Sequence, residues 1–124
     1  MKTKTISNLG AVFLLLALSG AASAAEVCTS RDNAMEHVNA VSDAISGSSF
    51  LGKRAYNDQT NMLIKAEAAI SKLKAYKFDD ANDKLVDISD KANALADSPK
   101  VKLADATAIN NAVGDAVVCI NDIM

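Results

Sequence analysis

Cys28 and Cys119 are the two cysteines of the 124-residue sequence. An even number of cysteines favours a disulfide if the chain is exported, as the interpretation of residues 1–24 below implies. Such bonds form and persist in oxidising compartments. Two buried, unbonded thiols are the alternative. We expect no metal site, because no CxxC pair and no histidine cluster accompanies these cysteines. The sequence therefore predicts a disulfide between Cys28 and Cys119.

His37 is the single histidine of the chain, and it lies one position from an apolar helical stripe. We interpret it as a surface or boundary residue. The sequence places no nucleophile and orienting acid beside it, so a catalytic triad has no support. The glutamates after residue 24 form no Glu-x-x-His pair of the kind that di-metal carboxylate bundles use. We therefore predict that the protein is not an enzyme and has no catalytic, cofactor-binding or metal-binding residues.

Aspartates form the most regular polar pattern of the chain. Asp83, Asp87 and Asp90 are three and four residues apart, which puts them on one face of a helix, called the acidic face below. A solvated face is one interpretation, and a docking surface for a basic protein partner is the other. Tyr76 and Phe78 lie in the adjoining turn, where aromatic side chains can anchor a partner. These five residues are the candidate partner surface.

A helical hairpin over residues 61–95 positions this surface. The two predicted helices meet in a tight turn at residues 76–79, and Asp79 or Asp80 is expected to cap the second. Each helix carries apolar residues three and four apart, which marks a face that must be buried. The stripe of the first helix comprises Leu63, Ala66, Ile70 and Leu73, with Tyr56 as its continuation, and that of the second comprises Ala81, Leu85, Ile88, Ala92 and Leu95.

Two further helices are expected to cover the hairpin. The first spans about residues 30–46, and the last is clearest from residue 105 onward, with Gly114 either a point of close helix approach or simply tolerated. Phe50 and Leu51, in the first connector, should both tuck against the core. The predicted stripes are Ala34, Val38, Val41 and Ile45 in the first helix, and Ala106, Ile109, Val113, Ala116 or Val117, and Ile120 in the last.

The predicted fold is therefore all-α, an antiparallel up-down-up-down bundle of four helices, or of three helices plus a short one. An even number of antiparallel helices returns the chain to its starting end. That arrangement brings Cys28 and Cys119 within the roughly 7 Å between Cα atoms that a disulfide requires. The bond should then tie the two ends of the bundle together.

Residues 1–24 are predicted to be a secretory signal peptide. Lys2 and Lys4 precede an apolar run over residues 11–18, and Ala22-Ser23-Ala24 is a site that signal peptidase accepts. The run is too short for a membrane span, which takes about 20 residues, although an uncleaved anchor is the alternative. We place cleavage after Ala24, which leaves residues 25–124 as one exported domain, periplasmic or secreted. No stable membrane insertion is expected.

The net charge after this cleavage is mildly acidic. Loss of Lys2 and Lys4 leaves 11 basic and 15 acidic side chains, a net charge of −4. Nucleic acid requires a basic face on the protein, and anionic membrane surfaces attract basic segments. We therefore expect neither as a partner.

The hairpin and the last helix resemble the FIMAH-type helical module of bacterial extracellular proteins. The resemblance covers about two-thirds of residues 25–124 and rests on the hairpin's apolar spacing, the run at residues 76–81, and Ala106, Ile109 and Val113. Modules of this type carry no known active site and act as accessory interaction units. The resemblance implies the same kind of role here.

These observations predict an exported, non-enzymatic helical bundle that binds another protein. The sequence does not identify this partner or the oligomeric state. The alternative is a carrier that holds a small ligand or a haem-like cofactor inside the bundle. Haem held without covalent attachment would use His37 and a methionine, for which Met35 and Met62 are the candidates. The last helix offers neither residue type between Asp105 and Ile120.

Overall fold

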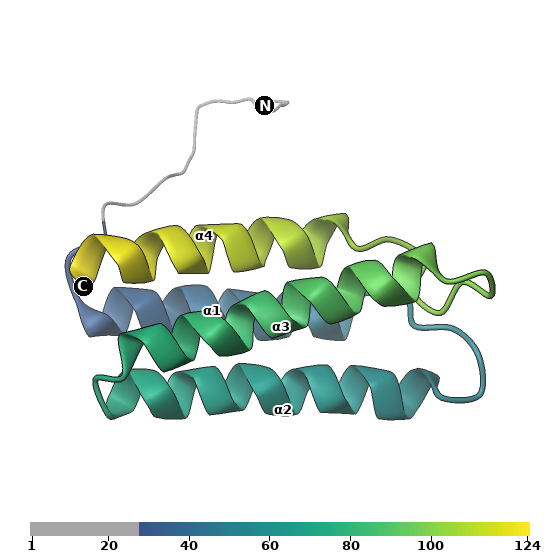
Figure 1. Ribbon diagram of the computed structural model, residues 1–124, viewed down its shortest axis with the longest axis horizontal. Coiled ribbons are helices and arrows are strands. Elements are labelled where there is room, and N and C mark those ends of the chain that lie inside the picture. Colours follow the sequence, from purple (N-terminus) through teal and green to yellow (C-terminus); the bar gives the residue numbers. More distant parts are fainter. Residues whose placement is uncertain (1–27) are drawn as a thin grey trace.

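A computed structural model describes residues 28–124, which form four helices in an antiparallel up-down-up-down bundle (Figure 1). The helices are α1 (Arg31–Gly47), α2 (Ala55–Lys74), α3 (Phe78–Asp97) and α4 (Thr107–Ile123). Each packs against its neighbours around the bundle: α1 against α2 and α4, and α3 against α2 and α4. The predicted fold class is confirmed. The predicted signal peptide lies outside the described residues.

The stripes predicted for α1 and α3 are buried in full. Every one of their nine apolar residues belongs to the core. Six alanines, from all four helices, are fully buried beside larger residues such as Leu85 and Ile88. Small side chains let helices approach closely, but each removes little apolar area from water. Burial of apolar surface stabilises the fold by about 25 cal/mol per Å². Ser30 caps the start of α1, because its hydroxyl accepts a hydrogen bond from the Asn33 amide.

The buried face of α2 differs from the prediction. Met62 and Ala69 occupy the core together with Ala66 and Leu73, whereas Leu63 and Ile70 lie half-buried on the flank. Tyr56 was predicted to continue the stripe, but its side chain is 78% exposed, so that prediction is wrong. The physical reason is helical spacing. Residues 56 and 63 are seven apart, about two turns, so both lie on the flank of α2 and not on its buried face.

The last helix buries Ile109, Val113, Ala116 and Ile120, and Cys119 joins them. Of the two alternatives at the fourth position, Ala116 is buried and Val117 is half-buried. Asp105 orders the start of α4, since its carboxylate accepts a hydrogen bond of 2.9 Å from the Thr107 amide. Hydrogen bonding from Thr107 holds the pKa of Asp105 below its usual range.

The connectors α1–α2 and α3–α4 pair with each other at one end of the bundle. Phe50 and Leu103 form an antiparallel bridge, in which the Leu51 amide donates to the Lys102 carbonyl and the Ala104 amide to the Ser49 carbonyl. Phe50 packs against the core as predicted. Leu51 does not: its side chain is 41% exposed. Neighbouring residues of an extended segment face opposite sides, so only one of the two can point inward.

The α2–α3 turn closes the opposite end with a Schellman motif. The Tyr76 amide donates to the Leu73 carbonyl at 3.0 Å, and the Lys77 amide donates to the Lys72 carbonyl at 2.8 Å. This geometry makes Phe78 the first residue of α3. Asp79 and Asp80 therefore lie inside its first turn, and the prediction that one of them caps the helix is wrong. Their charges still suit the positive end of the helix dipole.

Across residues 28–124, none of the helices combines the length and apolar character that crossing a membrane would require.

Candidate functional site

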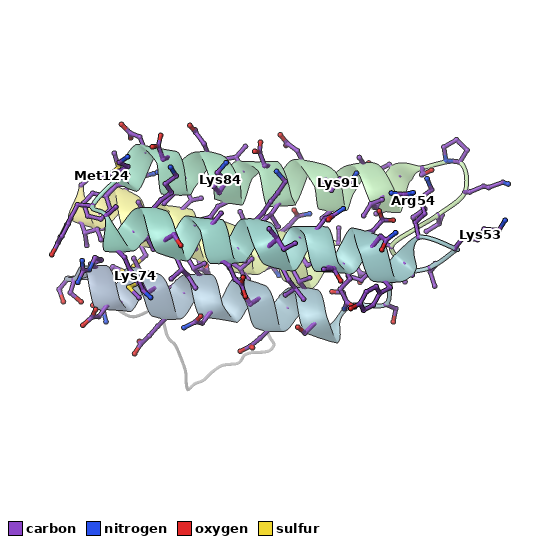
Figure 2. All side chains as sticks on the ribbon, turned by 90° about the horizontal axis from the view of Figure 1, so that it is seen from below. Lys53, Arg54, Lys74, Lys84, Lys91 and Met124 are labelled. Carbon is purple, nitrogen blue, oxygen red and sulfur yellow. A yellow bond between two sulfur atoms is a disulfide. The ribbon has the colours of Figure 1, made fainter. Side chains whose placement is uncertain are left out.

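The predicted disulfide and the predicted turn with Tyr76 and Phe78 lie at the same end of the bundle, here called the disulfide pole. Cys28 and Cys119 form the predicted disulfide there, with their Cα atoms 5.1 Å apart. The antiparallel order brings the start of α1, the turn and the end of α4 together at this pole (Figure 1). Figure 2 shows Lys74 and Met124 at this pole and Lys53 and Arg54 at the other.

Tyr76 is the most unusual residue of the disulfide pole. Its backbone has φ = 60°, the left-handed region in which the second-last residue of a Schellman motif is normally glycine. Its ring packs edge-on to Phe78, with 6.2 Å between ring centroids, and the Arg31 guanidinium lies 4.5 Å from the Tyr76 centroid. Arg31 also donates a hydrogen bond of 3.1 Å to the Lys74 carbonyl. The ring is held in place yet remains 66% exposed.

The acidic face runs along the outer side of α3. Asp83, Asp87 and Asp90 are all exposed. Asp83 and Asp90 lie opposite the buried stripe, whereas Asp87 is turned toward α2, where Lys65 reaches it at 3.8 Å. Figure 2 shows Lys84 and Lys91 on the same helix and carboxylate-tipped side chains that point away from the bundle. The face begins at the end of α3 that adjoins the α2–α3 turn, where Tyr76 is exposed. Phe78 differs from the other four candidate residues, because its side chain is half-buried and packs against the core.

Sequence reasoning missed the surroundings of the disulfide. His37 offers a ring nitrogen within 4.8 Å of both sulfur atoms, a cluster that the fold builds from the segment before α1, from α1 and from α4. Asp115 lies one helical turn before Cys119, and the charge of His37 acts on its carboxyl. Desolvation by the surrounding protein raises the pKa of Asp115 above its usual range, and His37 opposes that rise. The four-residue spacing of Asp115 and Cys119 places these two on one face of α4, but nothing in the sequence indicates that His37 lies beside them.

Asp58 is the one polar side chain in the core of the described region. It is 5% exposed, and its Oδ2 atom accepts no hydrogen bond from the residues described. Its position in the first turn of α2 favours a negative charge through the helix dipole. It lies at the other end of the bundle from the disulfide pole and is no part of the candidate site.

The residues considered for haem are divided between two environments. Met62 is fully buried in the core, and Met35 packs partly buried against it. The ligand atom of His37 instead lies beside the two sulfur atoms. The bundle interior is occupied by apolar side chains from all four helices. No feature of the described residues favours the carrier over the binding module.

Comparison with known proteins yields no relationship: no family model, no curated protein and no solved structure matches the chain. The resemblance to the FIMAH-type module stays a prediction from the residues.

Proposed function

We propose that this protein is an exported, non-enzymatic binding module that docks a basic protein partner along α3. Tyr76 and Phe78 would anchor the partner at the disulfide pole, and the acidic face would fix its orientation. The conformation and exposure of Tyr76 carry this proposal.

The energetics of Tyr76 favour a role outside folding. A non-glycine residue in the left-handed region costs about 1–3 kcal/mol. An exposed cation–π contact such as that with Arg31 returns about 0.5–1 kcal/mol. Glycine would avoid the cost, so folding alone gives no reason for a tyrosine here. A fixed aromatic ring with a polar tip is the type of residue enriched at protein interfaces, because little side-chain freedom is lost on binding.

The acidic face suggests the charge of the partner. Within the described residues, the ion pairs near the face are Lys65–Asp87 and Lys72–Asp80, which leave Asp83 and Asp90 available to a basic surface. Complementary charge accelerates encounter and fixes orientation more than it raises affinity. The predicted net charge of −4 adds to this attraction. Support for export comes from residues 1–24 and from the disulfide, a bond typical of oxidising compartments.

The test begins with a partner captured by the immobilised protein from the exported fraction of its native host. Affinity for that purified partner is then compared between the wild type and two variants. The first is Tyr76→Gly, which should weaken binding at least tenfold and leave the melting temperature nearly unchanged, since backbone relief offsets the lost contacts. The second combines Asp83→Asn, Asp87→Asn and Asp90→Asn. It should weaken binding at low salt and remove most of its salt dependence.

The matched control places the same charge change on another helix. Asp32→Asn, Glu36→Gln and Asp43→Asn together alter three exposed acids of α1. This variant should bind within about twofold of the wild type, because it leaves Tyr76 and the acidic face of α3 unchanged and the charges that it removes are exposed and screened. Equal weakening by the α1 and α3 triple variants, or full binding by Tyr76→Gly, would remove this surface from the proposal.

A further inference from the structure

The surroundings of the disulfide contain a set of atoms that a metal ion could use. The Cys28 and Cys119 sulfur atoms and a ring nitrogen of His37 lie within 4.8 Å of one another. The three residues come from separate parts of the chain, and the packing of α1 against α4 brings them together. While the disulfide is intact, the sulfur atoms have no thiolate charge to offer. Reduction converts them into two thiols beside an imidazole.

From this geometry we infer that the reduced protein binds one zinc ion through Cys28, Cys119 and His37, with water as the fourth ligand. Zinc prefers thiolate and imidazole ligands in tetrahedral geometry. With Zn–S bonds of about 2.3 Å, two thiolates on one ion lie roughly 3.8 Å apart, inside the span of the present cluster. Two thiolate charges neutralise the ion, which suits a site with little exposure to water.

The movement required to form the site is small. Sulfur atoms separate from a bond of about 2.0 Å to roughly 3.8 Å. Cys28 lies before the first residue of α1, outside any helix. Cys119 and His37 stay on α4 and α1. Both cysteines are buried, whereas His37 is half-buried, which leaves the ion an approach from the surface.

Asp115 lies near the cluster without joining it. It stands one helical turn before Cys119, and the charge of His37 acts on its carboxyl. Asp115 stands outside the cluster of ligand atoms and is therefore assigned no bond to the ion.

The chemistry balances with a dithiol as reductant. The dithiol gives two electrons and two protons to the Cys28–Cys119 bond, which becomes two thiols, and its own sulfurs form a disulfide. Zinc then binds both sulfurs and the neutral imidazole, and the two thiol protons are released to water. The folded chain would thus hold its ends together by a covalent bond when oxidised and by a metal when reduced.

Cobalt(II) provides the spectroscopic probe for this site. The protein is reduced with a phosphine, which becomes the phosphine oxide, and the reductant is then removed without air. Co²⁺ titration should give a thiolate-to-metal charge-transfer band that saturates at one equivalent, and Zn²⁺ should displace it. Circular dichroism in parallel reports the helices. If reduction unfolds the chain, Zn²⁺ should restore the helical signal, and failure to restore it would contradict the inference.

Matched variants identify the ligands. His37→Ala should weaken Co²⁺ binding at least about tenfold, whereas Asn39→Ala, an exposed change on the same helix, should leave it within about twofold. The oxidised protein and the Cys28→Ser/Cys119→Ser variant should give no charge-transfer band. The inference is overturned if the reduced, helical wild type gives no band or if His37→Ala binds as tightly as the wild type.

Discussion

At the scale of single residues, Gly114 shows how backbone freedom can be exchanged for stability. It lies within α4, and nothing lies within 4 Å of the position that a Cβ atom would take. The alternative of close helix approach is therefore wrong, and the glycine is simply tolerated. Gly114→Ala should raise the free energy of unfolding by about 0.5–1 kcal/mol, because alanine has less backbone freedom to lose. Urea unfolding of both proteins measures the change.

Gly52 provides the control for this prediction. It too has nothing within 4 Å of a built Cβ, but its φ is +88°, a conformation that side-chain-bearing residues rarely adopt. Gly52→Ala should therefore lower stability, opposite in sign to Gly114→Ala. If both substitutions shifted the midpoint in the same direction, backbone conformation would not be the cause.

Tyr76 marks a limit of sequence reasoning at this scale. Its place in the turn was predicted, as was its possible use as an anchor. Its left-handed backbone was not, because glycine and asparagine are the usual signals for that conformation and neither occurs there. Asp58 is similar: an aspartate in a first helical turn predicts a solvated residue, and the packing buries it.

At the scale of elements, the paired connectors depend on Leu103. This residue is fully buried, and it forms the bridge with Phe50 that joins the two connectors. Leu103→Ala should lower the free energy of unfolding by about 2–5 kcal/mol, the range for large-to-small changes in a core. Chemical denaturation followed by circular dichroism measures it.

Leu51→Ala is the matched change in the other connector. Because the Leu51 side chain is 41% exposed, its truncation should change stability by about 0.5 kcal/mol or less. Equal losses from the two variants would show that the connectors contribute nothing beyond general apolar area.

The helices themselves were predictable where one apolar stripe stood clear of its neighbours. In α1 and α3 most residues of the stripe have a polar neighbour in the sequence, and spacing alone identified every buried apolar residue. In α2, Met62 stands beside Leu63 and Ala69 beside Ile70, and two stripes one residue apart are equally periodic. Larger residues favoured the wrong stripe. The packing of α2 against α1 and α3 buries Met62 and Ala69 instead, and the sequence of α2 alone does not indicate that packing.

At the scale of the whole molecule, the disulfide joins residues 91 apart in sequence. Cys28→Ser/Cys119→Ser should lower the free energy of unfolding by about 4–5 kcal/mol in the chain-entropy model, because the unfolded chain regains the freedom that the closed loop removes. Thermal melting in oxidising buffer measures the loss. With reductant and a chelator present, variant and wild type should melt together, and a difference under those conditions would point to another role for the cysteines.

The candidate site was predictable only in its local parts. The acidic face follows from spacing within one helix, and the disulfide follows from an even cysteine count together with an even number of helices. The cluster of His37 with the two sulfurs joins residues from both ends of the chain. Its assembly depends on which faces of α1 and α4 meet, and the sequence contains no periodicity that records such a contact.

The bond between Cys28 and Cys119 turns residues 28–119 into a closed ring. A protease that cuts one connector opens this ring but releases no fragment, since both pieces remain attached through the sulfur atoms. Nicked protein would keep the mass of the intact chain plus one water, and it would fall into two pieces only on reduction. Resistance to fragmentation by a single cleavage thus follows from the disulfide-closed ring and does not depend on how much apolar surface the core buries.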